Sequence, residues 1–401
     1  MWADSVVALT VPVPEPTELA LRYYRSGNLL WGVDTLVGLL VPALALATGW
    51  SARLQAWAGR VARGRTAPTL ALYVVAFVVL ASIVTLPLTF YEGFVRAHAY
   101  GLSNQSFGKW LADGAKGLSV SCVVATLTAL LGYGILRRSP RRWWLWTTAA
   151  ALPLLAFGSL VAPVWLDPLF NRYGPLQDRA LETRILAEAR RAGIGRSRVF
   201  EVNKSVDTKA ISAYVTGFGP SKRIVLYDTI LRKLTPDEIL FVVGHEMGHF
   251  ILGHVLLGLV GTWMLVGASL YTVHRLAGRL LAGLGPRFGF ARLEDPASVP
   301  LFLLLANVVA LAATPLLLAG SRHLEHEADR FGLELTRANH AAATAFVKLQ
   351  QENLGVPRPG TFYRIWQASH PSLADRIEFA NDYHPWTSGA PLVYADRFVG
   401  D

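Results

Sequence analysis

The residues at positions 245, 246 and 249 carry the strongest chemical signal in this sequence. They lie in the segment His245-Glu-Met-Gly-His249, at the start of a long apolar run. Residues four apart share one face of a helix, so the two imidazoles can hold one metal ion while Glu246 lies beside it as a base. Zinc hydrolases use this His-Glu-x-x-His pattern to make a water molecule nucleophilic near neutral pH. The pattern is short enough to occur by chance, so other residues must support it.

A third ligand is expected just after the last apolar run, in the segment from Ser321 to Asp329. The last two apolar runs form a hairpin, which returns Glu325 to the side of the two histidines. Asp329 lies one helical turn further on, where it can accept the N–H of a ligating imidazole. Taken alone, the segment would be better explained as an exposed charged helix with i,i+4 pairs. Its position beside the first motif favours a zinc site with His245, His249 and Glu325 as ligands.

Further histidines stand near these segments. His370 precedes Pro371, and an imidazole beside zinc can hydrogen-bond the oxyanion of a tetrahedral intermediate. Arg376 can orient His370 or add positive charge, although an isolated His-Pro pair is more often a turn. His254, five residues after His249, is expected to point away from the ligand face, lining a chamber or packing.

Composition indicates a membrane protein. The chain of 401 residues is 52% hydrophobic and 16% charged, against about 25% charged residues in soluble proteins. Cys122 is the single cysteine, so an intrachain disulfide is excluded and zinc must be bound by histidine and carboxylate. The net charge of +10 comes from arginines clustered between apolar segments, which favours membrane topology over nucleic-acid binding. No secretory signal peptide is recognised, so the first span is expected to direct insertion.

Six segments are long and apolar enough to cross a bilayer, which takes about 20 residues. They are Leu29–Trp50, Ala67–Phe90, Leu118–Leu136, Trp143–Leu166, Phe250–Tyr271 and Val299–Ala319. Asp34 is the one acidic residue within them; it can line a cavity, but a position at a helix end is favoured. We therefore divide the chain into a membrane region, residues 1–166, and a metallopeptidase region, residues 167–401, that includes the spans at 250–271 and 299–319.

The segment between the fourth and fifth spans has mixed secondary structure. An amphipathic helix is predicted over 181–192, and strands over 198–202, 213–216 and 223–227, with a turn at 217–220. Thr235, Pro236 and Glu238 predict a helix start. That helix is expected to carry the His-Glu-x-x-His motif and continue into the fifth span.

Arginine-rich loops follow the first, third and fifth spans. With six spans these loops share one face, which the positive-inside rule places in the cytoplasm. The zinc motif and both termini then lie on the extracytoplasmic side.

The sequence resembles the CAAX prenyl endopeptidases, a family of integral-membrane gluzincin zinc metalloproteases, and indicates a bacterial member. The matching motifs occur in order through most of the chain. They are Tyr91–Val95, Pro168–Leu176, Ala213–Gly217, Arg223–Asp228, His245–His249, the residues Ser321, Arg322, Glu325, Ala328 and Asp329, and His370 and Pro371 with Arg376.

This resemblance implies a mainly α-helical membrane barrel enclosing a water-filled chamber. It implies one zinc ion held by His245, His249 and Glu325, with Glu246 as catalytic base. Ala213 and Tyr214 would lie on an edge strand that pairs with the substrate backbone. Ser212 stands where the family usually has Asn, so its contact with substrate is altered. Eukaryotic members also have an additional N-terminal span and a zinc site that faces the cytosol, against the loop count.

The substrate follows less directly from these residues. The resemblance implies a peptide or protein substrate, prenylated at a C-terminal CAAX sequence, whereas an Arg-rich and Ala-rich bacterial chain also suits removal of damaged membrane proteins. Two other functions remain as alternatives. One is a non-catalytic transporter or scaffold, which should lack a ligand or the base. The other is a site-specific signalling metalloprotease, which should carry a sensor domain. The sequence does not define the oligomeric state.

Overall fold

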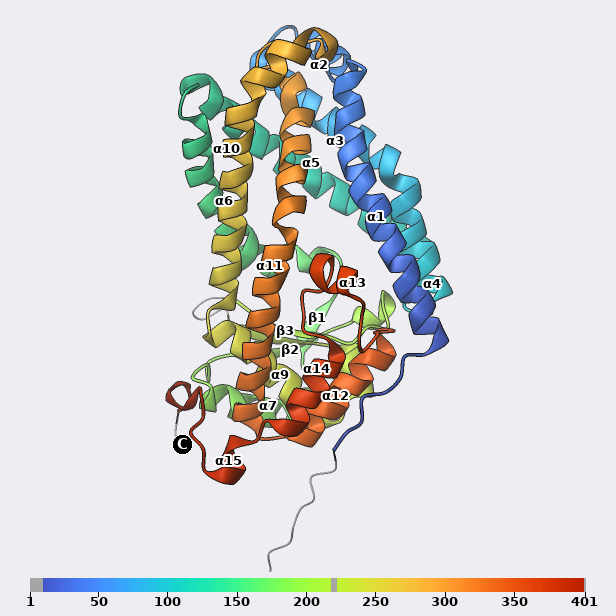
Figure 1. Cartoon of the computed structure of the whole chain (residues 1–401), viewed down its shortest axis with the longest axis vertical. Helices are drawn as coiled ribbons and strands as arrows, with labels where there is room; N and C mark the ends of the chain where they lie inside the picture. The colour runs from blue at the N-terminus through green and yellow to red at the C-terminus, as the bar shows by residue number, and fades with distance from the viewer. Residues whose placement is uncertain (1–9, 218–221, 400–401) are drawn as a thin grey trace, which may run out of the picture.

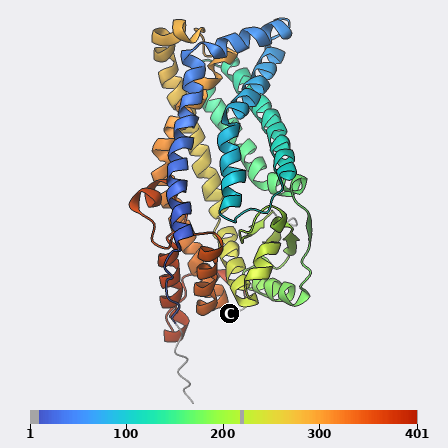
Figure 2. The same ribbon diagram turned by 90° about the vertical axis from the view of Figure 1, so that its right-hand side faces the viewer.

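The computed structural model describes residues 10–217 and 222–399, and most of them are helical. Long helices run side by side along the longest axis, and the sheet and shorter helices gather at one end (Figures 1 and 2). The main helices of the first half are α1 (Glu18–Ala47), α2 (Trp50–Val61), α3 (Thr66–Phe90), the π-helix η1 (Tyr91–Arg96), α4 (Ala97–Ala99), α5 (Phe107–Arg138), α6 (Trp143–Trp165) and α7 (Arg179–Arg191). Those of the second half are α8 (Asp228–Lys233), α9 (Pro236–Ile251), α10 (His254–Phe288), α11 (Val299–Thr336), α12 (Asn339–Glu352), α13 (Thr361–Trp366), α14 (Leu373–Asp382) and α15 (Pro385–Ser388).

Five described helical stretches are long and apolar enough to cross a membrane. They are Glu18–Ala47, Thr66–Ala99, Phe107–Arg138, His254–Phe288 and Pro296–Thr336. The expected span at 143–166 is the helix α6, which packs between α5 and α10. Each of the five stretches extends past at least one end of its predicted apolar run, and α11 continues without a break through Glu325. A mainly helical membrane fold with a small sheet is therefore confirmed.

Two acidic residues, Asp34 and Glu92, come together on the first two membrane-crossing helical stretches. Asp34 is near the middle of α1 and not at a helix end, so the favoured prediction was wrong. The second predicted span does not end at Phe90, because η1 and α4 extend α3 and place Glu92 within the same long helix. The carboxyl groups of Asp34 and Glu92 lie beside each other. Pairing is the usual arrangement for carboxyl groups at membrane depth.

The three arginine-rich loops meet at the end of the molecule farthest from the sheet, beside α2 (Figure 1). Arg137 Nη2 donates to the carbonyl of Glu294, 3.3 Å away, and the amide of Ala297 donates to Gln55 Oε1 at 2.9 Å. These contacts join the loops after the first, third and fifth expected spans. Below them, α3, α5, α6, α10 and α11 surround a largely apolar cavity of about 890 Å³.

The sheet contains four described strands in the order β1-β2-β4-β3. They are β1 (Tyr173–Pro175), β2 (Arg198–Val202), β3 (Ala213–Thr216) and β4 (Arg223–Tyr227). β2 and β4 are parallel, whereas β1 and β3 run antiparallel to their neighbours. The three predicted strands are confirmed, and β3 is an edge strand. The predicted turn at 217–220 lies, beyond Gly217, outside the described residues.

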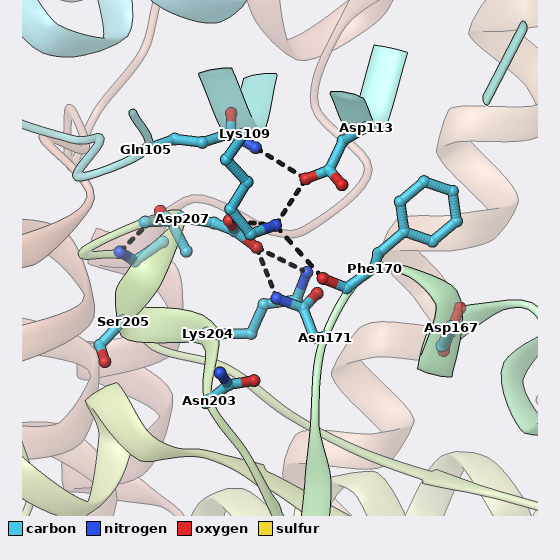
Figure 3. A network of polar contacts seen from close by, with 12 residues as sticks. Gln105, Lys109, Asp113, Asp167, Phe170, Asn171, Asn203, Lys204, Ser205 and Asp207 are labelled. Atoms are coloured by element: carbon cyan, nitrogen blue, oxygen red, sulfur yellow. Dashed lines mark hydrogen bonds and ion pairs between the residues drawn. The ribbon is translucent and has the colours of Figure 1, made fainter. Parts of the chain in front are cut away.

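A polar network fastens the membrane helices to the sheet (Figure 3). Lys109, near the start of α5, is 2.8 Å from Asp207 Oδ1 and donates to the carbonyl of Phe170 at 3.2 Å. Asn171 Nδ2 donates to Asp207 Oδ2 at 2.6 Å. Asp207 follows β2, and Phe170 and Asn171 follow α6. The network therefore joins three segments that are far apart in the sequence.

The helix that carries the His-Glu-x-x-His motif is shorter than predicted. It begins at a capping box formed by Thr235 and Glu238, as expected, but it ends at Ile251. Gly253 has a φ of +74°, a left-handed conformation that glycine adopts without a steric penalty from Cβ. A new helix, α10, starts at His254. The prediction of one continuous helix was wrong because Gly253 turns the chain.

Candidate active site

Two imidazoles from α9 and one carboxylate from α11 converge at the centre of the site. His249 Nε2 lies 3.1 Å from His245 Nε2. Each of these nitrogens is 3.4 Å from an oxygen of Glu325. Tetrahedral zinc with bonds of about 2.0–2.1 Å separates its ligand atoms by about 3.3 Å. The three side chains are therefore spaced as one metal ion requires.

Asp329 holds His245 from the side opposite the metal position. Its Oδ1 atom is 2.8 Å from His245 Nδ1, which leaves Nε2 directed toward His249 and Glu325. Arg376 donates through Nε and Nη2 to both oxygens of Asp329, at 2.8 and 2.6 Å. All three side chains are buried. Arg376 thus pairs with Asp329. From the sequence, Arg376 was considered as a residue that orients His370, but both of these hydrogen bonds go to Asp329.

Burial and charge set the protonation of the motif residues. Burial lowers the pKa of His245, but the carboxylates of Asp329 and Glu325 outweigh it and raise that pKa to about 9 before any metal binds. Burial also raises the pKa of Glu246, and the neighbouring imidazoles oppose that shift only in part. A carboxyl group with a raised pKa can both accept and return a proton near neutral pH.

His370 reaches the same centre from the C-terminal part of the chain. Its Nε2 atom is 3.2 Å from Glu325 Oε2, and its Nδ1 atom is 2.8 Å from Ser369 Oγ. The His370 side chain is 53% exposed, but partial loss of solvent around its ring lowers its pKa, which favours the neutral imidazole. A cleft of about 620 Å³ opens beside His370 and Arg376, between α1 and the segment from α12 to α14.

His254 lies beside the candidate metal ligands, although the sequence predicted another position for it. It was expected to point away from the ligand face, yet its Nδ1 atom is 2.9 Å from His249 Nδ1. The prediction assumed a continuous helix, and the turn at Gly253 brings the side chain back. The signal available in the sequence was Gly253, a glycine that follows the motif closely and lies inside an apolar run.

The edge strand β3 packs against α9. The amide of Tyr227 donates to the carbonyl of Ser212 at 3.1 Å, so alternation directs the backbone groups of Ala213 and Val215 to the free edge. The side chain of Tyr214 contacts Tyr173 of β1, and the two hydroxyl oxygens are 3.1 Å apart. Ser212 Oγ contacts the carbonyl of Ala213 at 3.5 Å.

Glycines allow α9 and α11 to approach closely. A Cβ atom at Gly332 would lie 3.0 Å from the backbone nitrogen of His245, and one at Gly248 would lie 3.1 Å from Phe331 Cβ. Real Cβ atoms are rarely found at such distances. This close approach brings Glu325 within reach of both histidines.

Known proteins share both halves of this arrangement. The model of peptidase family M48 matches residues 175–384, and that of the CAAX prenyl protease N-terminal region, with five membrane helices, matches residues 18–172. An uncharacterized metalloprotease of Bacillus subtilis, YhfN, is 35% identical over 91% of this chain and 86% of its own length. The CAAX prenyl protease 1 of Saccharomyces cerevisiae is 28% identical over 76% of this chain and 70% of its own.

The fold is also known from a solved structure. The crystal structure of S. mikatae Ste24p superimposes with a TM-score of 0.81, at 22% identity, over 94% of this chain and 93% of that one. Together with the site, these matches define a multi-pass membrane metalloendopeptidase. The chain belongs to peptidase family M48. The resemblance found in the sequence is confirmed.

Proposed function

We propose that this membrane endopeptidase holds one zinc ion between His245, His249 and Glu325. The separation of 3.1–3.4 Å among their ligand atoms carries this proposal. Two imidazoles and one carboxylate are a catalytic zinc set, which leaves a fourth position for water or substrate. Zinc bound there would polarise the scissile carbonyl and lower the pKa of water.

The side chains around the ion supply the remaining steps. Glu246 takes the proton of the attacking water and passes it to the leaving amine. His370 donates a hydrogen bond to the developing oxyanion. Asp329 and Arg376 act through His245, because their contacts fix its tautomer and the direction of its ring.

The substrate is proposed to bind as an extended strand along β3. The outward backbone groups of Ala213 and Val215 can pair with it, while Ser212 and Tyr214 lie beside that edge. Relatives named CAAX prenyl protease 1 support prenylated C-terminal peptides as one substrate class. Damaged membrane proteins are the second class. Purified protein incubated with a farnesylated CAAX peptide and its unprenylated twin separates the two, because only the first class requires the prenyl group.

The orientation in the membrane is proposed from the arginines. The three basic loops lie together at the end opposite the metal centre, and the positive-inside rule places them in the cytoplasm. The active site then faces the extracytoplasmic side. Residues 1–166 would form the membrane region, and residues 167–401 the metallopeptidase region with two of the spans. Reporter fusions to the loop after α2 and to the C-terminus test this orientation.

The proposed mechanism is tested by two variants in lipid or detergent. Glu246→Gln should keep about one zinc per chain and lose on the order of 10²–10⁴-fold in peptide cleavage. Glu325→Ala should lose both zinc and cleavage. A zinc-loaded Glu246→Gln protein that cleaves like the wild type would remove Glu246 from its role. Wild-type protein that neither binds zinc nor cleaves would favour the transporter or scaffold, and cleavage of one repressor alone would favour a signalling protease.

A further inference from the structure

Each metal-binding histidine has a polar partner on the side opposite the metal position, but the partners differ. His245 faces Asp329, which Arg376 neutralises. His249 faces His254, and the two Nδ1 atoms are 2.9 Å apart. The proposed mechanism gives His254 no role, although its side chain is only 4% exposed. A buried imidazole pointed at a metal ligand requires an explanation.

The position of one proton follows from the geometry. If His249 binds the ion through Nε2, its neutral ring carries hydrogen on Nδ1. That N–H can donate only to a lone pair, so His254 must present an unprotonated Nδ1. The hydrogen of His254 is then on Nε2. This arrangement fixes the tautomers of both rings.

Glu327 stands where the second hydrogen points. Its Oε2 atom is 3.6 Å from His254 Nε2, an electrostatic contact that favours hydrogen on that nitrogen. The carboxylate belongs to α11, two residues after the ligand Glu325 and on another face of the helix. Tyr394, in the C-terminal segment, approaches the other oxygen of Glu327 at 3.4 Å. α11 therefore supplies both a metal ligand and the support of a second ligand.

We propose that His254 is a positioning residue for the metal centre. It accepts the Nδ1–H of His249, and Glu327 holds His254 in the tautomer that can do so. This inference rests on the proposed zinc site. Such contacts orient a ligating imidazole and raise its basicity, and their loss typically weakens metal binding by about 10–100-fold. The turn at Gly253 directs His254 back to His249.

A packing role is the competing explanation, because His254 begins α10 in a buried position. The two roles differ in the protein without metal. A packing role would lower the thermal midpoint of the zinc-free protein, and any substitution that changes shape would do so. A positioning role would change zinc affinity and leave the zinc-free midpoint close to that of the wild type.

Two substitutions at position 254 separate these roles in the full-length protein. His254→Leu removes the acceptor, whereas His254→Asn keeps an oxygen near the place of Nδ1 and loses the contact with Glu327. His323→Leu is the matched control, because His323 is 73% exposed and lies 3.8 Å from Oε2 of Glu327, the same oxygen that faces His254. Zinc affinity is measured by competition with a chelator, and the Co²⁺-substituted protein gives a spectrum of the ligand field.

We expect His254→Leu to weaken zinc binding by about 10–100-fold and to shift the Co²⁺ bands. His254→Asn should recover most of the affinity, and His323→Leu should match the wild type. Wild-type affinity in His254→Leu, or equal loss in Leu and Asn with a lower zinc-free midpoint, would overturn the proposal. If His254→Leu does not fold, Glu327→Leu decides, because it removes the acceptor of the His254 Nε2–H, and unchanged zinc affinity there would overturn the role given to Glu327. If the wild-type protein binds zinc and cleaves peptide but the variants behave like it, only the role of His254 is disproved. If the wild-type protein binds no zinc, the proposed function is disproved as well.

Discussion

Different contacts stabilise the two ends of the molecule. The metal end surrounds His245, His249 and Glu325, and the loop end contains the three arginine-rich loops. At the metal end, a charged pair and close glycine contacts join α9, α11 and α14. At the loop end, neutral hydroxyl groups join α2, α3, α5 and the start of α11. There Tyr73 donates to Ser51 at 2.6 Å, and Ser51 donates to the carbonyl of Ala297 at 2.7 Å. Tyr133 and Ser298 form a similar pair at 2.7 Å.

Each end also has its own apolar core. The core of the metal end contains large side chains such as Phe241, Phe331 and Phe346, packed beside the sheet. The core of the loop end includes Tyr73 and Trp143 and lies among the membrane helices. α11 crosses from one core to the other. Hydrogen bonds between neutral hydroxyl groups therefore hold the buried part of the loop end, whereas buried charges fix the direction of His245 at the metal end.

Breaking the buried charged pair should have the largest effect on stability. Arg376→Leu leaves Asp329 buried without its guanidinium, and loss of one partner of a buried pair costs about 3–5 kcal/mol. The matched control is Arg358→Leu, which removes the exposed pair with Glu378 in the same region and should cost about 1 kcal/mol or less. Thermal unfolding in one detergent compares them. Equal losses in the two variants would contradict the assignment of a special role to charge at the metal end.

Separating α9 from α11 should have the next largest effect. Gly332→Ala places a Cβ atom 3.0 Å from the backbone nitrogen of His245, and overpacking of this kind costs about 1–3 kcal/mol. Because the shift moves Glu325 relative to His245, zinc affinity should fall as well. Gly320→Ala is the control in the same helix, where no atom lies within 4 Å of the added Cβ. That variant should be neutral or more stable by up to about 1 kcal/mol. A Gly332→Ala protein as stable as the control would show that α11 can move freely.

Features that depend on neighbouring residues could be predicted from the sequence, whereas contacts between distant segments could not. The strands at 198–202, 213–216 and 223–227, the capping box at Thr235 and the ligand spacing depend on local patterns, and the structure contains all of them. The turn at Gly253 was missed because glycine is common in apolar helices and hydropathy does not register its φ.

Long-range contacts were beyond the local patterns. No periodicity indicates that Arg376 meets Asp329, 47 positions earlier, or that Gly332 meets the backbone of His245. Asp34 was placed at a helix end because the apolar run begins near Leu29, whereas α1 starts at Glu18. Hydropathy finds the apolar part of a membrane helix and does not find its ends.

At the loop end the expected effect is smaller. Tyr73→Phe removes the hydrogen bond to Ser51 and keeps the ring, which should cost about 1 kcal/mol. Ser51 keeps its bond to the carbonyl of Ala297, so no buried donor is left without a partner. Zinc affinity and peptide cleavage should not change, since α9 and α11 are untouched at the metal end. Tyr271→Phe, at an exposed position on α10, is the control. If Tyr73→Phe lowered the free energy of unfolding by more than about 3 kcal/mol, as expected for Arg376→Leu, the proposed difference between the two ends would be contradicted.

The smallest effect concerns the pH dependence of the metal end. Burial raises the pKa of Glu238, but Lys348, 2.7 Å away, and the amide of Thr235 outweigh it, so the net shift is downward. A carboxyl group with a lowered folded-state pKa adds stability above its unfolded value, near 4.5, and loses it as the pH falls through the folded value. Glu238→Gln keeps an oxygen for the capping box and removes the charge. The thermal midpoints of wild type and variant should therefore differ at pH 7 and draw together as the pH falls from about 4.5 through the lower folded-state pKa. A difference that persists unchanged at low pH would show that Glu238 acts through packing and not through its charge.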